Sequence, residues 1–303
     1  MSNSSIFQNP KSGSIKVTGS FEIVDEQGNV KETVTDPKLC GCGLSQEKPF
    51  CDKSHAQYVK VVSEALTKAR NLVKPITPFG TWSLRANEIR NRTLEYRIAV
   101  GEKLLGVKFG GALLKGNSEA KNYGPIFGFL TDVMQIDSTL ELSTLIIPVA
   151  EAEVVFKLSQ ELSGEITLDQ VHDYVSKVAP GIEIFDSRYG ITNPFIDDAV
   201  ADNACAGAFA VGKWRDAKDV NFEGCEISIY EDESLNQKVP ASSIAGNPWA
   251  AVVNVSKLLA AAGVKLPAGS IIFSGSATSG IAMKPGKYRV VIDDLGEVSF
   301  LAS

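Results

Sequence analysis

Hydrophobic residues recur at intervals of three and four along the stretch that follows residue 55. The positions that carry this pattern are Val59, Val62, Leu66, Ala69 and Val73. The spacing predicts an amphipathic helix, which ends before Pro75 because the residue preceding a proline avoids helical geometry. We expect a second helix over 85–100, ending at Gly101.

Two further segments have helical features. Asn247 suits a helix cap, Pro248 suits the first helical position, and Gly263 suits the residue just beyond the end. These three residues predict a helix between them. The segment 167–178, TLDQVHDYVSKV, has amphipathic spacing and predicts another helix, with His172 as a surface residue.

The remaining chain alternates short apolar segments with Gly/Pro turns, as β-strands do. Near the start, strands are predicted over 14–18, 21–24 and 30–34, with a turn at 25–28. The glycine-rich segment GVKFGG at 106–111 lacks the spacing of a phosphate-binding loop. The pattern as a whole predicts an α+β protein that is mostly β, and excludes a doubly wound nucleotide-binding fold.

Composition narrows the classes of partner. The 303 residues fit two domains, and the formal net charge is −6. No Lys/Arg-rich stretch is present to displace counterions, so we expect no nucleic-acid partner. No apolar run reaches the roughly 18 residues of a membrane span, and the polar start lacks the apolar core of a signal peptide. A cytoplasmic protein with no membrane association is the expectation.

Cysteine and histidine are concentrated in one place. The chain has five Cys and two His, and four of these seven residues fall between 40 and 55: Cys40, Cys42, Cys51 and His55. Thiolates and an imidazole crowded together suit zinc or an iron–sulfur cluster. The ligands are not arranged as the two paired knuckles of a typical zinc finger.

The stretch LCGCGLSQEKPFCDKSH resembles the CDGSH iron–sulfur domain, whose pattern is C-x-C-x2-S-x3-P-x-C-D-G-S-H. Lys53 stands where that pattern has glycine. The resemblance implies a β-rich domain over 1–56 and a [2Fe–2S] cluster, with Cys40 and Cys42 on one iron and Cys51 and His55 on the other. Electron relay, redox sensing and a structural role for the cluster all remain open, and a redox partner is one expectation.

Acidic residues stand in apolar strands of the second part of the chain. Glu151 and Glu153 alternate within PVAEAEVVFKL and therefore share a strand face. Glu183 lies between two isoleucines in GIEIFDSRYG. Three carboxylates suit Mg²⁺ or Mn²⁺, although a solvated strand face is the alternative for the Glu-x-Glu pair. Lys108, in LLGVKFGG, is a candidate acid or base beside the metal, or a charge on an exposed strand edge.

Eight sequence blocks resemble the hydratase/decarboxylase branch of the fumarylacetoacetate hydrolase superfamily over about 57–302. They include GVKFG at 106–110, PIFGFLTDVM at 125–134, PVAEAEVVF at 148–156, EIFDSRYG at 183–190 and IIFSGSAT at 271–278. The other three are the helical lead-in, VADNACAGAFAVG at 200–212 and GNPWAAVVNVSKLLAAAG at 246–263. The resemblance implies a catalytic domain over 57–303 with a mixed β fold and flanking helices.

The resemblance also assigns residues. It implies that Glu151, Glu153 and Glu183 bind the metal and that Lys108 is the active-site lysine. The residues matched to substrate contacts are Ile126, Phe127, Cys205 and Ser276. Hydratases commonly carry an acid where this chain has Ile126, and Cys205 replaces a serine.

The expected activity is that of a lyase on a small 2-oxo acid from the meta-cleavage degradation of aromatic compounds. Decarboxylation of 2-oxohex-3-enedioate to 2-hydroxypenta-2,4-dienoate is the first hypothesis, because an apolar Ile126 suits a reaction that needs no base to activate water. Hydration of 2-hydroxypenta-2,4-dienoate is the alternative within the class. A non-catalytic partner subunit and a redox-sensing iron–sulfur protein are further alternatives. The resemblance implies a homo-oligomer and admits a hydratase/decarboxylase partner.

Overall fold

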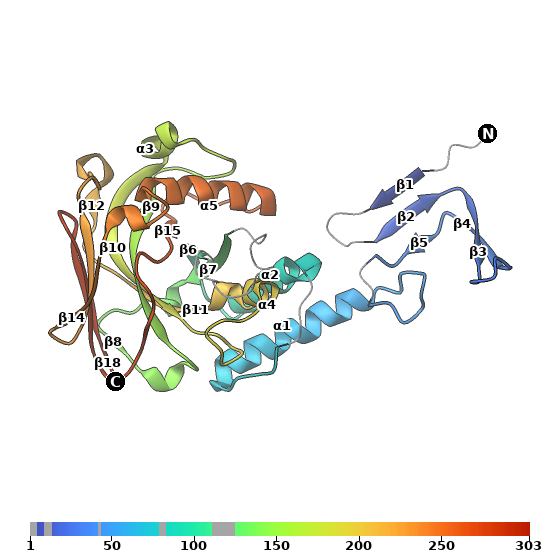
Figure 1. Ribbon diagram of the computed structural model, residues 1–303, viewed down its shortest axis with the longest axis horizontal. Helices are drawn as coiled ribbons and strands as arrows, with labels where there is room; N and C mark the ends of the chain where they lie inside the picture. Colours follow the sequence, from blue (N-terminus) through green and yellow to red (C-terminus); the bar gives the residue numbers. More distant parts are fainter. Residues whose placement is uncertain (1–4, 9–13, 42–43, 79–82, 111–124) are drawn as a thin grey trace.

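The computed structural model describes residues 5–8, 14–41, 44–78, 83–110 and 125–303. A small β-rich region at the N-terminus is joined through a long helix to a larger domain of two sheets (Figure 1). The mostly β architecture predicted for this chain is confirmed.

Five short strands form the N-terminal region. They are β1 (Ser5–Gln8), β2 (Ile15–Thr18), β3 (Ser20–Val24), β4 (Val30–Thr35) and β5 (Lys38–Leu39). Strands β1, β2 and β5 make one sheet, and β3 and β4 make a separate hairpin. The Asp25 carboxylate closes the hairpin turn by accepting hydrogen bonds from the backbone N–H groups of Gln27 and Asn29. The predicted strands and turn are confirmed.

Three helices pack together beside the sheets: α1 (Ser54–Leu72), α2 (Ser83–Ala99) and α4 (Ile196–Ala201). Their apolar faces form a small core with Tyr189. The amphipathic helix and its successor are therefore confirmed. Helix α1 runs without a break across position 56, where the boundary between the two domains is expected.

The larger domain is built on two mixed sheets. The first has the order β11-β10-β9-β15-β6-β7, with β12 beside β10 and β16 beside β9. Its strands are β6 (Leu104–Gly110), β7 (Ile126–Thr131), β9 (Val149–Leu158), β10 (Val175–Phe185), β11 (Ala206–Val211), β12 (Arg215–Asp216), β15 (Ile271–Phe273) and β16 (Ile281–Ala282). The pairs in this sheet are antiparallel except β15 with β6.

The second sheet has the order β14-β13-β17-β18-β8. Its strands are β8 (Thr139–Leu140), β13 (Glu226–Glu231), β14 (Ser234–Pro240), β17 (Gly286–Ile292) and β18 (Gly296–Ala302). One continuous hydrophobic core contains side chains of both sheets, such as Val154 of β9 and Val290 of β17. This core buries one face of β9 and β10, and their other face carries the predicted acidic residues.

Helix α5 (Pro248–Ala262) covers part of the first sheet (Figure 1). The Asn247 side chain accepts a hydrogen bond from the backbone N–H of Trp249 at 3.1 Å, and Gly263 takes a left-handed φ of 66°. The predicted cap, proline and terminating glycine are therefore confirmed.

The helix predicted over 167–178 is wrong beyond its first half. Helical turns cover Leu168–Gln170 and α3 (Val171–Tyr174), after which β10 begins at Val175. Pairing with β9 and burial of Val175 and Val178 in the core override the helical spacing. His172 is exposed, as expected, and packs against the Trp249 ring.

Short 3-10 helices connect several of these elements. They are η2 (Asp132–Met134), η3 (Leu142–Thr144), η4 (Leu168–Gln170), η5 (Asn203–Cys205), η6 (Ala217–Asp219) and η7 (Ala241–Ser243). No helix in the described ranges is long and apolar enough to span a membrane.

Candidate metal centre and active-site cavity

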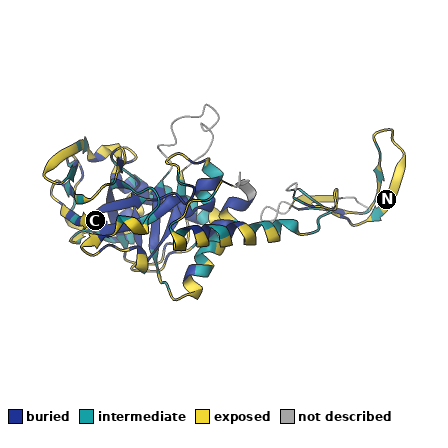
Figure 2. Cartoon of the chain, turned by 90° about the horizontal axis from the view of Figure 1, so that it is seen from below, coloured by how far each residue is buried: buried dark blue, intermediate teal, exposed yellow. Residues whose placement is uncertain are grey.

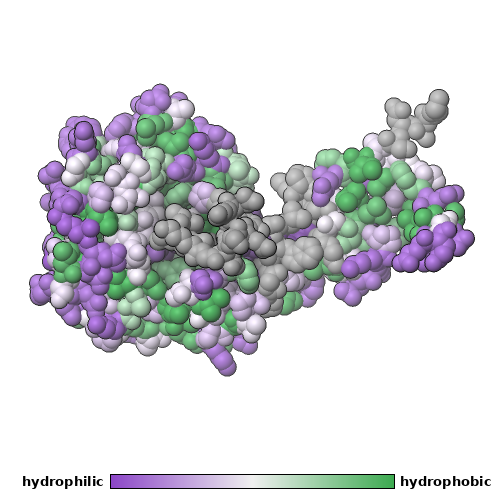
Figure 3. Space-filling view, viewed as in Figure 1, coloured by the Kyte–Doolittle hydropathy of each residue, from purple (hydrophilic) through white to green (hydrophobic). Residues whose placement is uncertain are grey.

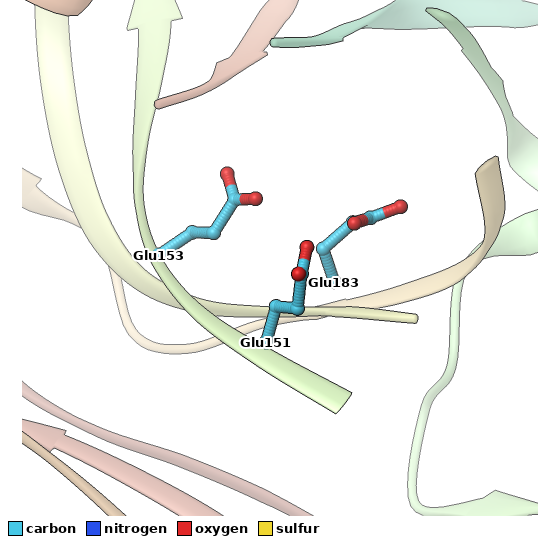
Figure 4. Close-up of side chains that lie close together, drawn as sticks. All are labelled: Glu151, Glu153 and Glu183. Carbon is cyan, nitrogen blue, oxygen red and sulfur yellow. The ribbon is translucent and has the colours of Figure 1, made fainter. Parts of the chain in front are cut away.

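Strand register brings the three predicted carboxylates together. In the antiparallel pair β9–β10, Glu183 stands directly opposite Glu151, and Glu153 stands opposite Gly181 two residues along. Residues at these positions point to the same face of the sheet. One carboxylate oxygen from each glutamate lies within 4.8 Å of the others, and the side chains converge in Figure 4.

Two of the three carboxylates are fully buried, and each has an oxygen atom without a hydrogen-bond partner in the described part of the chain. Glu153 and Glu183 are fully buried, and the Oε1 atom of each has no hydrogen-bond partner among the described residues. The backbone N–H of Gly275 donates to Glu153 Oε2 at 2.8 Å. Buried ionised groups are costly unless they are paired or coordinate a metal. The group therefore fits a hard divalent cation, and the alternative of a solvated strand face is wrong.

Burial and mutual repulsion alter how these acids ionise. Burial, and then the charge of Glu183, raises the pKa of Glu151 to about 8. The same two causes raise the pKa of Glu153 well above its usual value. A divalent cation would reverse the effect, because opposite charge favours the ionised carboxylate.

Lys108 belongs to the same constellation. It lies on β6, which pairs with β15 and β7, so the alternative of an exposed edge charge is wrong. Its Nζ lies 3.2 Å from Glu183 Oε2. Burial alone would lower the pKa of Lys108, but the charges of the glutamates, that of Glu183 above all, outweigh it and raise this pKa. The side chain is thus held as a cation.

These groups open into a cavity of about 710 Å³. Lys108 and Glu151 line it, together with three of the four predicted substrate contacts: Ile126, Cys205 and Ser276. Glu153 and Glu183 lie behind this surface, fully buried. The rest of the described lining is neutral and mostly apolar.

Phe127 does not line the cavity. Side chains alternate along β7, so Ile126 and Phe127 point to opposite faces. The Phe127 ring is buried with the Arg90 guanidinium 3.8 Å from its centroid. Its assignment as a substrate contact is corrected accordingly: this ring packs beneath the site.

Cys205 enters the cavity from a strained turn. Asn203, Ala204 and Cys205 all take positive φ angles of 57°, 52° and 55°, a conformation that non-glycine residues rarely adopt. The Asn203 side chain stabilises the turn through hydrogen bonds with the backbone of Phe129 at 2.7 and 2.8 Å. Burial, followed by the charge of Asp202, raises the pKa of the Cys205 thiol, which keeps it neutral.

Sequence reasoning missed several groups of this site. Gly275 supplies a hydrogen bond to Glu153 and has a φ of 86°, with too little space beside Phe109 for a side chain. Thr192, Ser243 and Asn254 add polar groups to the cavity lining. The sequence did contain a signal for Asn254, which is an isolated amide in an apolar helix.

The predicted cluster ligands lie where the N-terminal strands meet α1. An isolated bridge between Leu39 and Phe50 places Cys40 and Cys51 on adjoining segments, and His55 lies in the first turn of α1. Cys42 lies outside the described residues. Burial, and then the charges of Arg85 and Lys38, lower the pKa of His55, so the imidazole is in the neutral form that binds metals.

Hydrogen bonds and a strained backbone shape this loop. The Asp52 carboxylate accepts hydrogen bonds from the backbone N–H groups of Gln46 and Ser54. Lys53, in the place of the motif's glycine, takes a left-handed φ of 70°. The motif's glycine is therefore explained by backbone conformation.

Comparison with known protein families assigns a family to the larger domain and another to the N-terminal region. The profile described as fumarylacetoacetate (FAA) hydrolase C-terminal matches residues 139–300, more than half of the chain. The chain belongs to the fumarylacetoacetate hydrolase family. The profile described as iron-binding zinc finger CDGSH type matches residues 12–56, so this family member carries an N-terminal domain of the iron-binding CDGSH type.

Relatives of this family member with curated functions include decarboxylases and hydratases. A 4-oxalocrotonate decarboxylase from Pseudomonas sp. is 32% identical over 71% of this chain and 85% of its own length. A 2-hydroxyhexa-2,4-dienoate hydratase from Comamonas testosteroni is 31% identical over 78% and 92%. Both are lyases, and the predicted enzyme class is confirmed.

The same fold occurs in a 4-oxalocrotonate decarboxylase from Pseudomonas putida G7, solved in complex with magnesium and adipate. It aligns with a TM-score of 0.75 and 24% identity over 82% of this chain and 98% of that protein. The predicted mixed β fold with flanking helices is confirmed.

Proposed function

We propose that this family member is a divalent-metal-dependent decarboxylase of 2-oxohex-3-enedioate, also called 4-oxalocrotonate, yielding 2-hydroxypenta-2,4-dienoate. One observation carries the proposal: a buried group of three carboxylates and a lysine faces a cavity whose remaining described lining is neutral. The decarboxylase relatives support the same reaction.

Glu151, Glu153 and Glu183 would hold Mg²⁺ or Mn²⁺, which suit oxygen-rich sites. When bound, the ion supplies positive charge for the oxygen on which negative charge develops. The orphaned Oε1 atoms of Glu153 and Glu183 are the support in this structure for a resident cation.

The chain's own residues favour loss of CO2. The bond to the terminal carboxylate breaks, CO2 leaves, and the electron pair moves through the conjugated chain to the 2-oxo oxygen. Lys108 is held as a cation at the acidic end of the cavity. Its Nζ would orient the 2-oxo group and give a proton to that oxygen.

The described lining around the terminal carboxylate is uncharged, in contrast to the end of the cavity that holds Lys108 and the glutamates. Ile126 and the neighbouring neutral residues offer no cation to stabilise a carboxylate that is about to lose its charge. Negative charge thus moves during the reaction from a region whose described lining has no cation towards the 2-oxo oxygen, which the Lys108 cation and a bound metal ion would face. Such a lining stabilises the transition state more than the bound substrate.

Hydration of 2-hydroxypenta-2,4-dienoate is the second candidate, favoured by the hydratase relative. A hydratase must activate water with a base. The described lining offers Lys108, Glu151 and the neutral Cys205 thiol as titratable groups. Lys108 is a cation and Glu151 is a candidate metal ligand, so decarboxylation is the better supported reaction.

The N-terminal domain would bind a [2Fe–2S] cluster through Cys40, Cys42, Cys51 and His55. Loss of CO2 moves an electron pair within one molecule and consumes no external electrons. We therefore assign the cluster no role in the chemical step.

Purified protein should be given 2-oxohex-3-enedioate and Mg²⁺ in one experiment and 2-hydroxypenta-2,4-dienoate and Mg²⁺ in another. The proposal expects CO2 release in the first and slow or no water addition in the second. Water addition without CO2 release would replace it with the hydratase. Inactivity in both assays, with Mg²⁺ bound, would overturn the proposal of catalysis.

A further inference from the structure

Helix α5 contributes one isolated amide to the cavity. Asn254 lines the cavity, and its side chain makes no hydrogen bond with any described residue. Its neighbour Ser256 is different: that hydroxyl donates to the Val253 carbonyl and accepts a hydrogen bond from the backbone N–H of Ile166. Asparagine is unfavourable inside a helix, so the position of Asn254 suggests a ligand-binding role.

The polar groups of the cavity differ in whether they already have hydrogen-bond or ion-pair partners within the protein. The Ser274 and Ser276 hydroxyls donate to the carbonyls of Gly275 and Thr278. Lys108 and Glu151 are the charged residues of the described lining, and Lys108 is paired with Glu183. The Asn254 amide therefore offers the cavity an uncharged N–H donor that no described residue occupies.

We infer that Asn254 is a specificity-determining residue whose Nδ2 donates a hydrogen bond to the terminal carboxylate of the substrate, the group that leaves as CO2. This inference rests on the proposed function. A carboxylate in a neutral cavity needs a donor to compensate for lost water. A neutral amide recognises that carboxylate without the strong stabilisation that a lysine or arginine would give to the bound substrate.

The test compares two ligands that lack the conjugated double bond and so cannot lose CO2 by this route. Both 2-oxohexanedioate and 2-oxohexanoate carry the 2-oxo acid group at one end. Only 2-oxohexanedioate also has a terminal carboxylate at the other end. Calorimetric titration in Mg²⁺ gives the ratio of their dissociation constants. In Asn254→Leu, which keeps the branching at Cγ, is somewhat larger and loses the donor, the preference for the diacid should fall by about tenfold.

A charge variant and its control sharpen the result. Asn254→Asp should weaken binding of the diacid further, while binding of 2-oxohexanoate stays within about twofold of the wild type. Asn236→Asp adds the same charge at an exposed residue of β14, outside the cavity lining, and should leave the ratio unchanged. Retained binding of 2-oxohexanoate verifies that each variant is folded.

Turnover gives an independent readout. Asn254→Lys should lower KM for 2-oxohex-3-enedioate and also lower kcat, because a cation stabilises the carboxylate that must lose its charge. An unchanged diacid preference in Asn254→Leu would overturn the inference and leave the proposed function standing. Failure of both ligands to bind the wild type in Mg²⁺ would overturn the proposed function, and the inference with it.

Discussion

The two candidate metal sites of this chain have contrasting surroundings. In the larger domain the ligands lie on two long strands, one face of which is buried in a core shared by both sheets. In the N-terminal region the described ligands Cys40 and Cys51 lie on loop segments, and His55 lies in the first turn of a helix. Among the described residues before Ser54, Val17 is the one aliphatic side chain counted as buried, and Figure 2 shows mostly exposed residues there.

Exposed apolar side chains add to this contrast. Ile6, Phe7, Val24 and Val30 are all at least half exposed, and hydrophobic residues gather at the surface of the N-terminal region (Figure 3). So small a core cannot offset the conformational entropy of the ordered chain. Strands hold the carboxylates in place before a metal binds, whereas we expect the N-terminal fold to depend on bound iron.

The largest expected effect follows from removing each metal separately. Removal of iron should abolish amide protection in residues 14–53, because binding of the metal supplies most of the folding free energy of a small domain. Removal of Mg²⁺ with EDTA should leave the protection of β9 and β10 unchanged. Hydrogen exchange read by mass spectrometry measures both. Persistent protection of β2–β5 in iron-free protein would contradict the expected dependence of the N-terminal fold on iron.

Glu153→Gln tests the carboxylate site next. We expect Mg²⁺ affinity to fall by more than about 100-fold, beyond the range seen when outer partners of a metal ligand are lost. The melting temperature without Mg²⁺ should stay or rise, because glutamine replaces a buried acid whose ionisation is opposed by burial and by the neighbouring carboxylates. Titration calorimetry and thermal melting measure the two quantities, with Glu165→Gln at an exposed site as the matched control. A normal affinity for Mg²⁺ would remove Glu153 from the site.

Binding of Mg²⁺ should also depend on pH. The raised pKa of Glu151, about 8, means that the folded protein without metal retains a proton that the cation must displace. Affinity should therefore increase with pH by up to tenfold per pH unit for each proton released. Calorimetry in two buffers of different ionisation enthalpy counts the protons. Binding without proton release at pH 6.5 would contradict the raised pKa.

The raised pKa of Glu151 also makes the stability of the metal-free protein depend on pH. Below the ordinary carboxyl pKa of 4.5, Glu151 is protonated in both folded and unfolded states. Between 4.5 and about 8 only the unfolded state loses that proton, so the stability of the protein without metal should fall as pH rises. The rise in melting temperature on adding Mg²⁺ should accordingly be larger at pH 8 than at pH 6.

The smallest expected effect concerns Lys53. Replacing it with glycine relieves a left-handed backbone and should stabilise the iron-loaded N-terminal domain by about 1 kcal/mol. Resistance to iron release, followed by the visible absorption of the proposed cluster during heating, measures this change. Lys31→Gly, in strand β4, should act in the opposite direction because it adds flexibility without relieving strain. Equal effects of the two variants would refute the conformational explanation.

Much of this contrast was predictable from sequence. The alternation of Glu151 and Glu153 predicts a shared face, and helical spacing predicts α1. The sequence did not contain the register that sets Glu183 opposite Glu151, since strand pairing depends on distant contacts. Strand pairing also explains why the helix expected over 167–178 becomes part of β10.

The cavity was less predictable than the metal ligands. Phe127 shares a motif with Ile126, yet alternation along β7 turns it to the other face. Asn254 is distant from the acidic residues in sequence, and packing of α5 against the sheet brings it to the same cavity. Such residues become visible when tertiary structure is known.

The assignment of the chemistry to the larger domain is tested most directly by measuring CO2 release from 2-oxohex-3-enedioate by protein depleted of iron and of divalent cations in turn. EDTA should abolish release, Mg²⁺ should restore it, and iron-free protein with Mg²⁺ should remain active. Release that survives EDTA, or that is lost with iron although Mg²⁺ is bound, would contradict the assignment of the chemistry to the three glutamates and Lys108.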